Sequence, residues 1–169
     1  AVGVSALQSN TSGSNNVALG TLSLGFNETG ANNTAVGAAA LLNNTDRSGL
    51  VAVGDSALAR NSLNATLSHE AIGNTALGSK ALKHNAKGYY NTATGFAALS
   101  SNTDAPANTA NGFQSLTNNT TGQANTAMGF WSAANNSSGS SNVALGDRAA
   151  YTNSAGSFNT ALGAESLYN

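Results

Sequence analysis

Small, apolar and polar residues follow one another in the same order along the whole chain of 169 residues. The recurring phrase is Asn-Thr/Val-Ala-x-Gly-x-x-Ala/Ser-Leu, as in the segment that runs from Asn33 through Gly37 to Leu41. Consecutive copies lie 17 residues apart, with one spacing of 24. A fixed period this short indicates a solenoid, in which each repeat forms one coil and buries its apolar residues only against its neighbours.

Three columns of residues define the register of the repeat. The glycines are Gly3, Gly20, Gly37, Gly54, Gly78, Gly95, Gly112, Gly129, Gly146 and Gly163. Alanine stands two residues before every one of these glycines. Asparagine stands seven residues after the glycine in every repeat that extends so far. Stacked coils place equivalent residues above one another, so we expect each set to form a column along a rod.

The phrase around each glycine predicts β-structure. Side chains alternate in character from the asparagine to the glycine, as in a strand, and the following Ala-Leu pair is expected to enter a second short strand. Runs such as 118–122, rich in Asn, Thr and Gly, have the composition of turns. A repeat of 17 residues is too short for the helix-pair repeats of roughly 33 to 47 residues. We therefore predict an all-β parallel β-solenoid of about ten coils, a single domain over residues 1–169 that is part of a longer fibre.

The asparagine column is expected to have a structural role, because identical amides stacked on one another form hydrogen-bonded ladders. The candidate ladder comprises Asn27, Asn44, Asn85, Asn102, Asn119 and Asn136.

The two faces of the first strand compete for the interior of the coil. One face carries Ala and Gly, and the other carries Thr or Val and a mostly apolar position. We favour the larger residues as the core, which leaves the alanines as a flat outer strip and a candidate interface of a homotrimer. Asn111, which lies in the apolar column, is the objection to this choice, so the opposite choice stays open. The candidate interface residues are Ala35, Ala76, Ala93, Ala110 and Ala127.

The seven-residue insertion, within residues 62–73, is the largest departure from the repeat. Insertions in solenoids form exposed loops on one face, often a binding face. The candidate binding loop is Leu67, Ser68, His69 and Glu70. The alternative is a surface loop that packs Leu67 and Ile72 locally without a ligand.

Two further departures concern aromatic and basic side chains. Phe96, Phe113 and Phe130 follow three consecutive repeat glycines, with Trp131 beside the last, which predicts an aromatic stripe. We favour a subunit interface for this stripe over a contact with carbohydrate or protein. The only basic cluster is suited to sulfated or sialylated glycans, but we favour a single solvated coil over such a site. It comprises Lys80, Lys83, His84 and Lys87.

Composition removes several classes of function. Charged residues make up 8% of the chain and the net charge is −1, so we expect no nucleic-acid partner. The chain holds no apolar run long enough to insert into a membrane. Its two histidines, His69 and His84, show no nucleophile and base arrangement, and no acidic loop recurs. We therefore expect no enzymatic activity, no catalytic residues, no metal site and no cofactor.

The phrase Asn-Thr/Val-Ala-Val/Leu-Gly resembles the head repeats of trimeric autotransporter adhesins and the repeats of tail-fibre-like proteins of phages and bacteria. The resemblance covers essentially the whole chain, although the adhesin repeat has a shorter period. It implies a left-handed β-roll packed as a trimer, which serves as a rigid rod of an extracellular fibre on a bacterial surface or a virion. A cell-surface glycan or protein is the implied target.

Two alternatives stay open. One is a self-assembling structural filament that has no receptor of its own. The other is an ice-binding solenoid, because flat ranks of threonine bind ice. This threonine rank, interrupted by valines, comprises Thr34, Thr75, Thr92, Thr109, Thr126 and Thr160.

Overall fold

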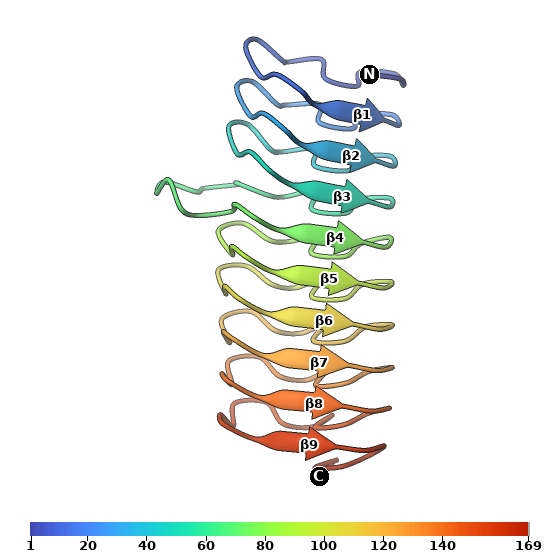
Figure 1. The fold of residues 1–169 in the computed structure, drawn as a ribbon, viewed down its shortest axis with the longest axis vertical. Helices are drawn as coiled ribbons and strands as arrows, with labels where there is room; N and C mark the ends of the chain where they lie inside the picture. The colour runs from blue at the N-terminus through green and yellow to red at the C-terminus, as the bar shows by residue number, and fades with distance from the viewer. Residues whose placement is uncertain (169) are drawn as a thin grey trace.

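The computed structural model describes residues 1–168 as coils stacked along one straight axis (Figure 1). Each coil from the second repeat onward contributes one three-residue strand to a single nine-stranded sheet, ordered as in the chain. The strands are β1 Val17–Leu19, β2 Thr34–Val36, β3 Val51–Val53, β4 Thr75–Leu77, β5 Thr92–Thr94, β6 Thr109–Asn111, β7 Thr126–Met128, β8 Val143–Leu145 and β9 Thr160–Leu162.

Every neighbouring pair of strands is parallel and pairs each residue with its equivalent one repeat later, as in Ala93 with Ala110. The predicted parallel β-solenoid with a 17-residue period is therefore confirmed. The count of strands is lower than the ten repeats, because Val2 in the first repeat forms only an isolated parallel bridge to Leu19.

The strand faces are the reverse of the arrangement that we favoured from the sequence. The central alanine of every strand is buried inside its own coil, and the residues on either side of it point outward. The interface assigned to Ala35, Ala76, Ala93, Ala110 and Ala127 is therefore wrong, since these side chains are 0–1% exposed in the single chain. Asn111 lies on the outer face in contact with solvent, which removes the objection that it raised.

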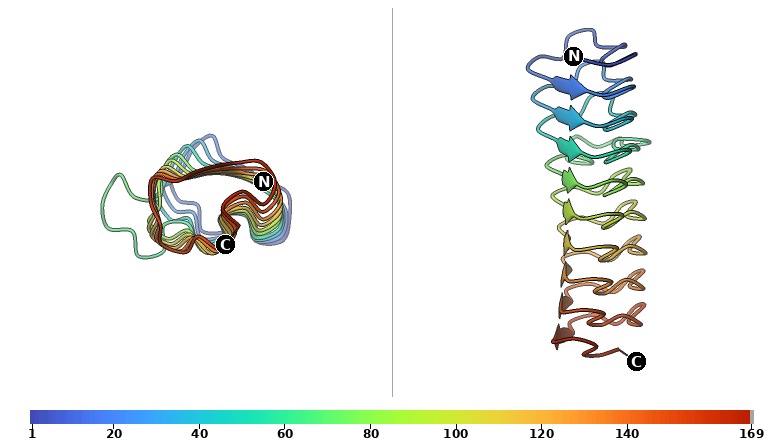
Figure 2. Two further views of the ribbon diagram at one scale, coloured as in Figure 1. Left: turned by 90° about the horizontal axis from the view of Figure 1, so that it is seen from below. Right: turned by 90° about the vertical axis from the view of Figure 1, so that its right-hand side faces the viewer.

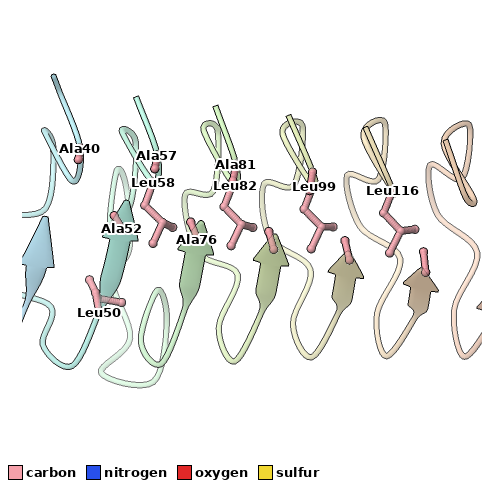
Figure 3. Packing of buried hydrophobic residues seen from close by; sticks show 14 of the residues in the cluster. Ala40, Leu50, Ala52, Ala57, Leu58, Ala76, Ala81, Leu82, Leu99 and Leu116 are labelled. Atoms are coloured by element: carbon pink, nitrogen blue, oxygen red, sulfur yellow. The ribbon is translucent and has the colours of Figure 1, made fainter. Parts of the chain in front are cut away.

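The narrowness of the coil explains this reversal. Opposite most strands, a leucine four residues after the glycine fills the interior, as Leu41, Leu58, Leu82, Leu99 and Leu116 do with 0% exposure (Figure 3). Alanine takes this buried position in the coils of β7 and β8, at Ala133 and Ala150. Only a methyl group fits between this leucine and the strand, so the interior selects alanine. Each buried leucine contributes about 1.5–3 kcal/mol relative to an exposed one.

The segment after each glycine is not the second strand that we expected. Its residues alternate between negative and positive φ, with Leu99 at φ 51° and Ala97 at φ 54°. A non-glycine residue that adopts this left-handed conformation costs roughly 1–2 kcal/mol. Alternation of this kind curls the segment tightly enough to turn the leucine inward, and burial of the leucine offsets the strain.

The predicted asparagine ladder is confirmed. The Nδ2 atom of each ladder asparagine donates to the Oδ1 atom of its equivalent in the preceding coil, for example Asn102 to Asn85 at 2.8 Å and Asn136 to Asn119 at 2.9 Å. The other links are Asn27 to Asn10, Asn44 to Asn27, Asn61 to Asn44, Asn85 to Asn61 and Asn119 to Asn102. Buried amides without hydrogen-bond partners are costly, and the ladder supplies these partners for the asparagines inside the coil.

A second asparagine ladder, which we did not predict, runs along the entry to each strand. The backbone N–H of Asn108 donates to Asn91 Oδ1 at 2.9 Å, and the Nδ2 of Asn108 donates to Gly122 O at 3.0 Å. The repetition of this asparagine in the phrase was the available signal. In the fourth repeat Leu50 replaces it, and the Leu50 N–H still donates to Asn33 Oδ1 at 3.0 Å.

Candidate functional site

The inserted segment leaves the stack as a long loop that projects from the edge of the sheet where the strands begin (Figures 1 and 2). It departs after Asn61 and rejoins the coil at Ala71. Asn61 Nδ2 donates to Ala71 O at 2.9 Å, which is the bond that other coils form three residues after the asparagine. The ladder therefore passes the insertion without interruption, and the loop can vary without disturbing the stack.

Glu70 holds the loop together from inside. Its Oε2 atom accepts hydrogen bonds from the backbone N–H groups of Thr66 at 2.6 Å and Leu67 at 2.9 Å. Lys87 Nζ of the next coil lies 4.0 Å from Glu70 Oε1. The hydrogen bonds from Leu67 and Thr66, with the charges of Lys87 and His69, hold the pKa of Glu70 below its usual value of 4.5.

Glu70 makes the order of the loop depend on pH. A lowered pKa in the folded loop means that the ionised form stabilises it above pH 4.5, and that this contribution is lost as the pH falls through the lowered pKa. We expect the amide resonances of Thr66 and Leu67 to shift together below pH 4.5 in an NMR titration. Glu70→Gln should abolish that joint titration, and a midpoint at or above 4.5 would contradict the hydrogen-bonded geometry.

The other predicted loop residues lie on its surface. Leu67, Ser68 and His69 are exposed, and the Leu67 carbonyl accepts a hydrogen bond from Arg47 Nη2 at 3.2 Å. The His69 ring meets the Tyr89 ring edge-on, with centroids 5.3 Å apart. The loop therefore does pack locally, through these contacts, but it keeps an exposed rim.

Sequence reasoning missed a cleft between the loop and the coils beside it. The cleft has a volume of about 430 Å³ and is lined by residues 46–49, by Ser68, Ile72 and Gly73 of the inserted coil, and by Tyr90. The Arg47 side chain is 10% exposed, and its Nη1 atom lies 2.9 Å from Asp46 Oδ2. The available signal was Arg47 itself, which stands where other repeats have glycine or alanine.

The three phenylalanines form one column, as predicted. The rings of Phe96 and Phe113 are stacked with centroids 5.4 Å apart, and those of Phe113 and Phe130 with centroids 5.2 Å apart. Lys80 covers the free face of Phe96, and Trp131 packs on Phe130 at 4.6 Å. Because the ring faces are already covered, a sugar ring has no face to stack on, and the column presents half-exposed ring edges.

The basic cluster does not form one patch. Lys80 Nζ lies 5.5 Å from the centroid of the Phe96 ring, and Lys87 faces Glu70. The pKa of His84 is lowered by burial and by the positive charges of Arg60 and Lys83, which favours its neutral form. This arrangement gives little support to an anionic glycan at the cluster.

The described residues, 1–168, hold no group of three or more His, Cys, Asp or Glu side chains placed to bind a metal ion. Within the same range, the chain forms no helix with the length and apolar character of a membrane span. The sequence finds no match among the models of protein families, the curated proteins or the solved structures with which it was compared.

Proposed function

We propose that this chain is a segment of a non-enzymatic extracellular fibre, in which left-handed solenoids associate as a homotrimer to form a rigid rod for attachment to a cell surface. The observation that carries the proposal is the exposure of apolar side chains on the outer face of the sheet. The rod is stiff because ladders of backbone and asparagine hydrogen bonds run along it, and the inserted loop is the main projection from it.

The outer face of the sheet carries at least one apolar residue in every described strand except β5 and β6, where threonine and asparagine point outward. Among the apolar residues that flank the buried alanines, five are exposed, by up to 64% at Leu162 and by 42% at Leu77, and the others, such as Val36 and Val53, are partly buried. Met128 and Leu19 each expose 47%. Apolar residues that gather on one exposed face in this way mark interaction surfaces. The surface that we assign to self-association is therefore the outer face, in place of the alanine column.

Three such faces can meet around one axis with the rods parallel, so that a closed cyclic assembly covers all of them. The resemblance to adhesin heads favours three subunits. Each member of the Phe96, Phe113 and Phe130 column stands two residues after the end of a strand. Its exposed ring edges would extend the apolar contact between neighbouring subunits.

Assembly is tested by a charge on the outer face. The wild-type chain should have three times its mass of 16.7 kDa in light scattering. Met128→Glu should dissociate it, because a buried unpaired carboxylate costs several kcal/mol, yet leave the circular dichroism of the coil unchanged. The matched control is Gln123→Glu, at an exposed site just before the same strand. A monomeric wild-type chain, or a Met128→Glu variant that stays assembled, would contradict the proposal.

The alternatives differ in their results. A filament without a receptor would assemble beyond the trimer and would bind no cells. Ice binding is favoured by one observation, since Thr34, Thr92, Thr126 and their equivalents lie on the outer face. That rank can meet ice only in a monomer, because assembly buries it, so the mass measurement decides between the two roles.

A further inference from the structure

We propose that the cleft beside the inserted loop binds a neutral saccharide. The inference rests on the attachment function proposed above and names its ligand class. The cleft lies between the turn at residues 46–49, the inserted coil and Tyr90, and its volume of about 430 Å³ falls in the range of small-molecule sites.

Glycines at the same position of two consecutive repeats create the space of the cleft. The residue five positions before each repeat glycine lies at the surface with positive φ, and most repeats place a side chain there. Gly49 and Gly73 are the exceptions. The members of this column are Asn15, Asn32, Gly49, Gly73, Tyr90, Ala107, Ala124, Ser141 and Phe158.

The two glycines act differently. A Cβ atom on Gly73 would lie 2.6 Å from Tyr90 Cδ1, so glycine lets the tyrosine ring pack against the backbone of the inserted coil. A Cβ atom on Gly49 would meet nothing within 4 Å, so that position is open space. The result is a floor of bare backbone with the Tyr90 ring, 60% exposed, at one end.

The polar groups of the cleft match sugar hydroxyls. The Asp46 side chain is 49% exposed and offers carboxylate acceptors, and the hydroxyls of Ser48 and Ser68 both donate and accept. Arg47 Nε is buried and has no hydrogen-bond partner among the described residues. The amphipathic ring of Tyr90 suits the C–H face of a pyranose. Unlike the phenylalanine column, this ring is not sandwiched between equivalents of the adjacent coils.

Charge favours a neutral sugar over an acidic one. Asp46 and Arg47 form an ion pair at 2.9 Å, so the rim carries no net charge. A sulfate or carboxylate on the ligand would approach the exposed Asp46 carboxylate, and like charges at close range repel in a partly desolvated site. Hydroxyl groups can bond to both partners of the ion pair without this cost.

The cleft stays accessible in the proposed assembly. The inserted loop projects from the edge where the strands begin, whereas the phenylalanine column follows the strand ends at the opposite edge (Figure 1). The view along the axis shows the loop extending away from the rest of the coil outline (Figure 2). Association through the outer face of the sheet would therefore leave one cleft open on each subunit.

The test is an NMR titration of the ¹⁵N-labelled full chain with lactose, maltose and N,N′-diacetylchitobiose, and with glucuronic acid and glucose 6-sulfate for comparison. At least one neutral probe should shift the amides of Gly49, Ser68, Gly73 and Tyr90 saturably, with a Kd on the order of millimolar for so open a cleft. The acidic probes should bind more weakly.

Gly49→Asn is the decisive variant. It introduces the residue that occupies the equivalent position at Asn15 and Asn32, and asparagine tolerates positive φ, so the coil should fold unchanged. Filling the cleft should weaken binding by about tenfold or more. Phe158→Ala, which removes an exposed aromatic ring from the same column far from the loop, should have no effect on binding.

Three results would overturn the saccharide site: no shift with any neutral probe, shifts that survive Gly49→Asn, or tighter binding of the acidic probes. None of them bears on assembly. If the chain is a trimer but no neutral probe binds, only the saccharide site is contradicted. If the chain is a monomer and a neutral probe binds, only the fibre role is contradicted.

Discussion

Gly95→Ala is expected to destroy the regular stack. A Cβ atom at this position would lie 2.5 Å from the Gly112 carbonyl oxygen and 2.7 Å from its carbonyl carbon. The contact is with backbone, which cannot move aside without separating two coils. The residue also has φ +123°, a conformation that costs a side chain roughly 1–3 kcal/mol. We expect the variant to lose several kcal/mol of stability and to accumulate as insoluble or unfolded protein.

Gly163→Ala is the matched control for that substitution. Gly163 has a similar φ of +110°, but a Cβ atom there would meet none of the described residues within 4 Å. Gly163→Ala should therefore show the conformational strain without the clash and lose about 1–3 kcal/mol of stability. Thermal unfolding followed by circular dichroism compares the two variants. Equal melting temperatures would show that the glycine column does not set the spacing between coils.

Asn102→Ala is expected to cost about 3 kcal/mol or more. Asn102 is fully buried, and its Nδ2 atom donates to Asn85 Oδ1 at 2.8 Å and to Ala105 O at 3.0 Å. Its Oδ1 atom accepts from Asn119 Nδ2 at 3.1 Å. Alanine would leave these buried partners without their hydrogen bonds, at roughly 1–3 kcal/mol for each group that stays unsatisfied. Urea denaturation measures the loss.

Asn153→Ala is the control for the ladder. Asn153 belongs to the same sequence column, but among the described residues it bonds only to Gly156 within its own exposed turn: its Nδ2 atom donates to Gly156 O, and its Oδ1 atom accepts from the Gly156 N–H. Asn136 Oδ1 accordingly has no partner among the described residues, so the ladder ends at Asn136. We expect a loss of about 1 kcal/mol or less at Asn153, because water replaces both exposed hydrogen bonds. Equal losses at both sites would contradict a cooperative ladder.

The repeat by itself determined the parallel solenoid, its period and the stacking of equivalent residues. The strand of each coil follows from the Thr-Ala-Val type of phrase, and a fixed spacing requires identical residues to meet. The second strand that we predicted after the glycine was wrong, because that segment curls through alternating φ. The Asn102 ladder and the Phe113 stack were predictable for the same reason, since columns follow from periodicity alone. The insertion was also visible as the single irregular spacing.

Only the tertiary structure decided which side of the strand is inside. Periodicity assigns Ala93 and Thr94 to opposite faces but does not say how wide the coil is. The leucine of the opposite flank, turned inward by positive φ, fills that width and leaves room only for alanine. A width of this kind is set by packing across the coil, which the order of residues in one repeat does not reveal.

The cleft likewise depended on contacts between coils. Gly49, Gly73 and Tyr90 belong to three repeats. They form part of one cleft only because the stack places them in one column beside the loop. Arg47 and Leu67 lie 20 residues apart and are joined by a hydrogen bond that exists because the loop folds back over its neighbour. The sequence determined what stacks, whereas packing within and between coils decided which surfaces are left to bind.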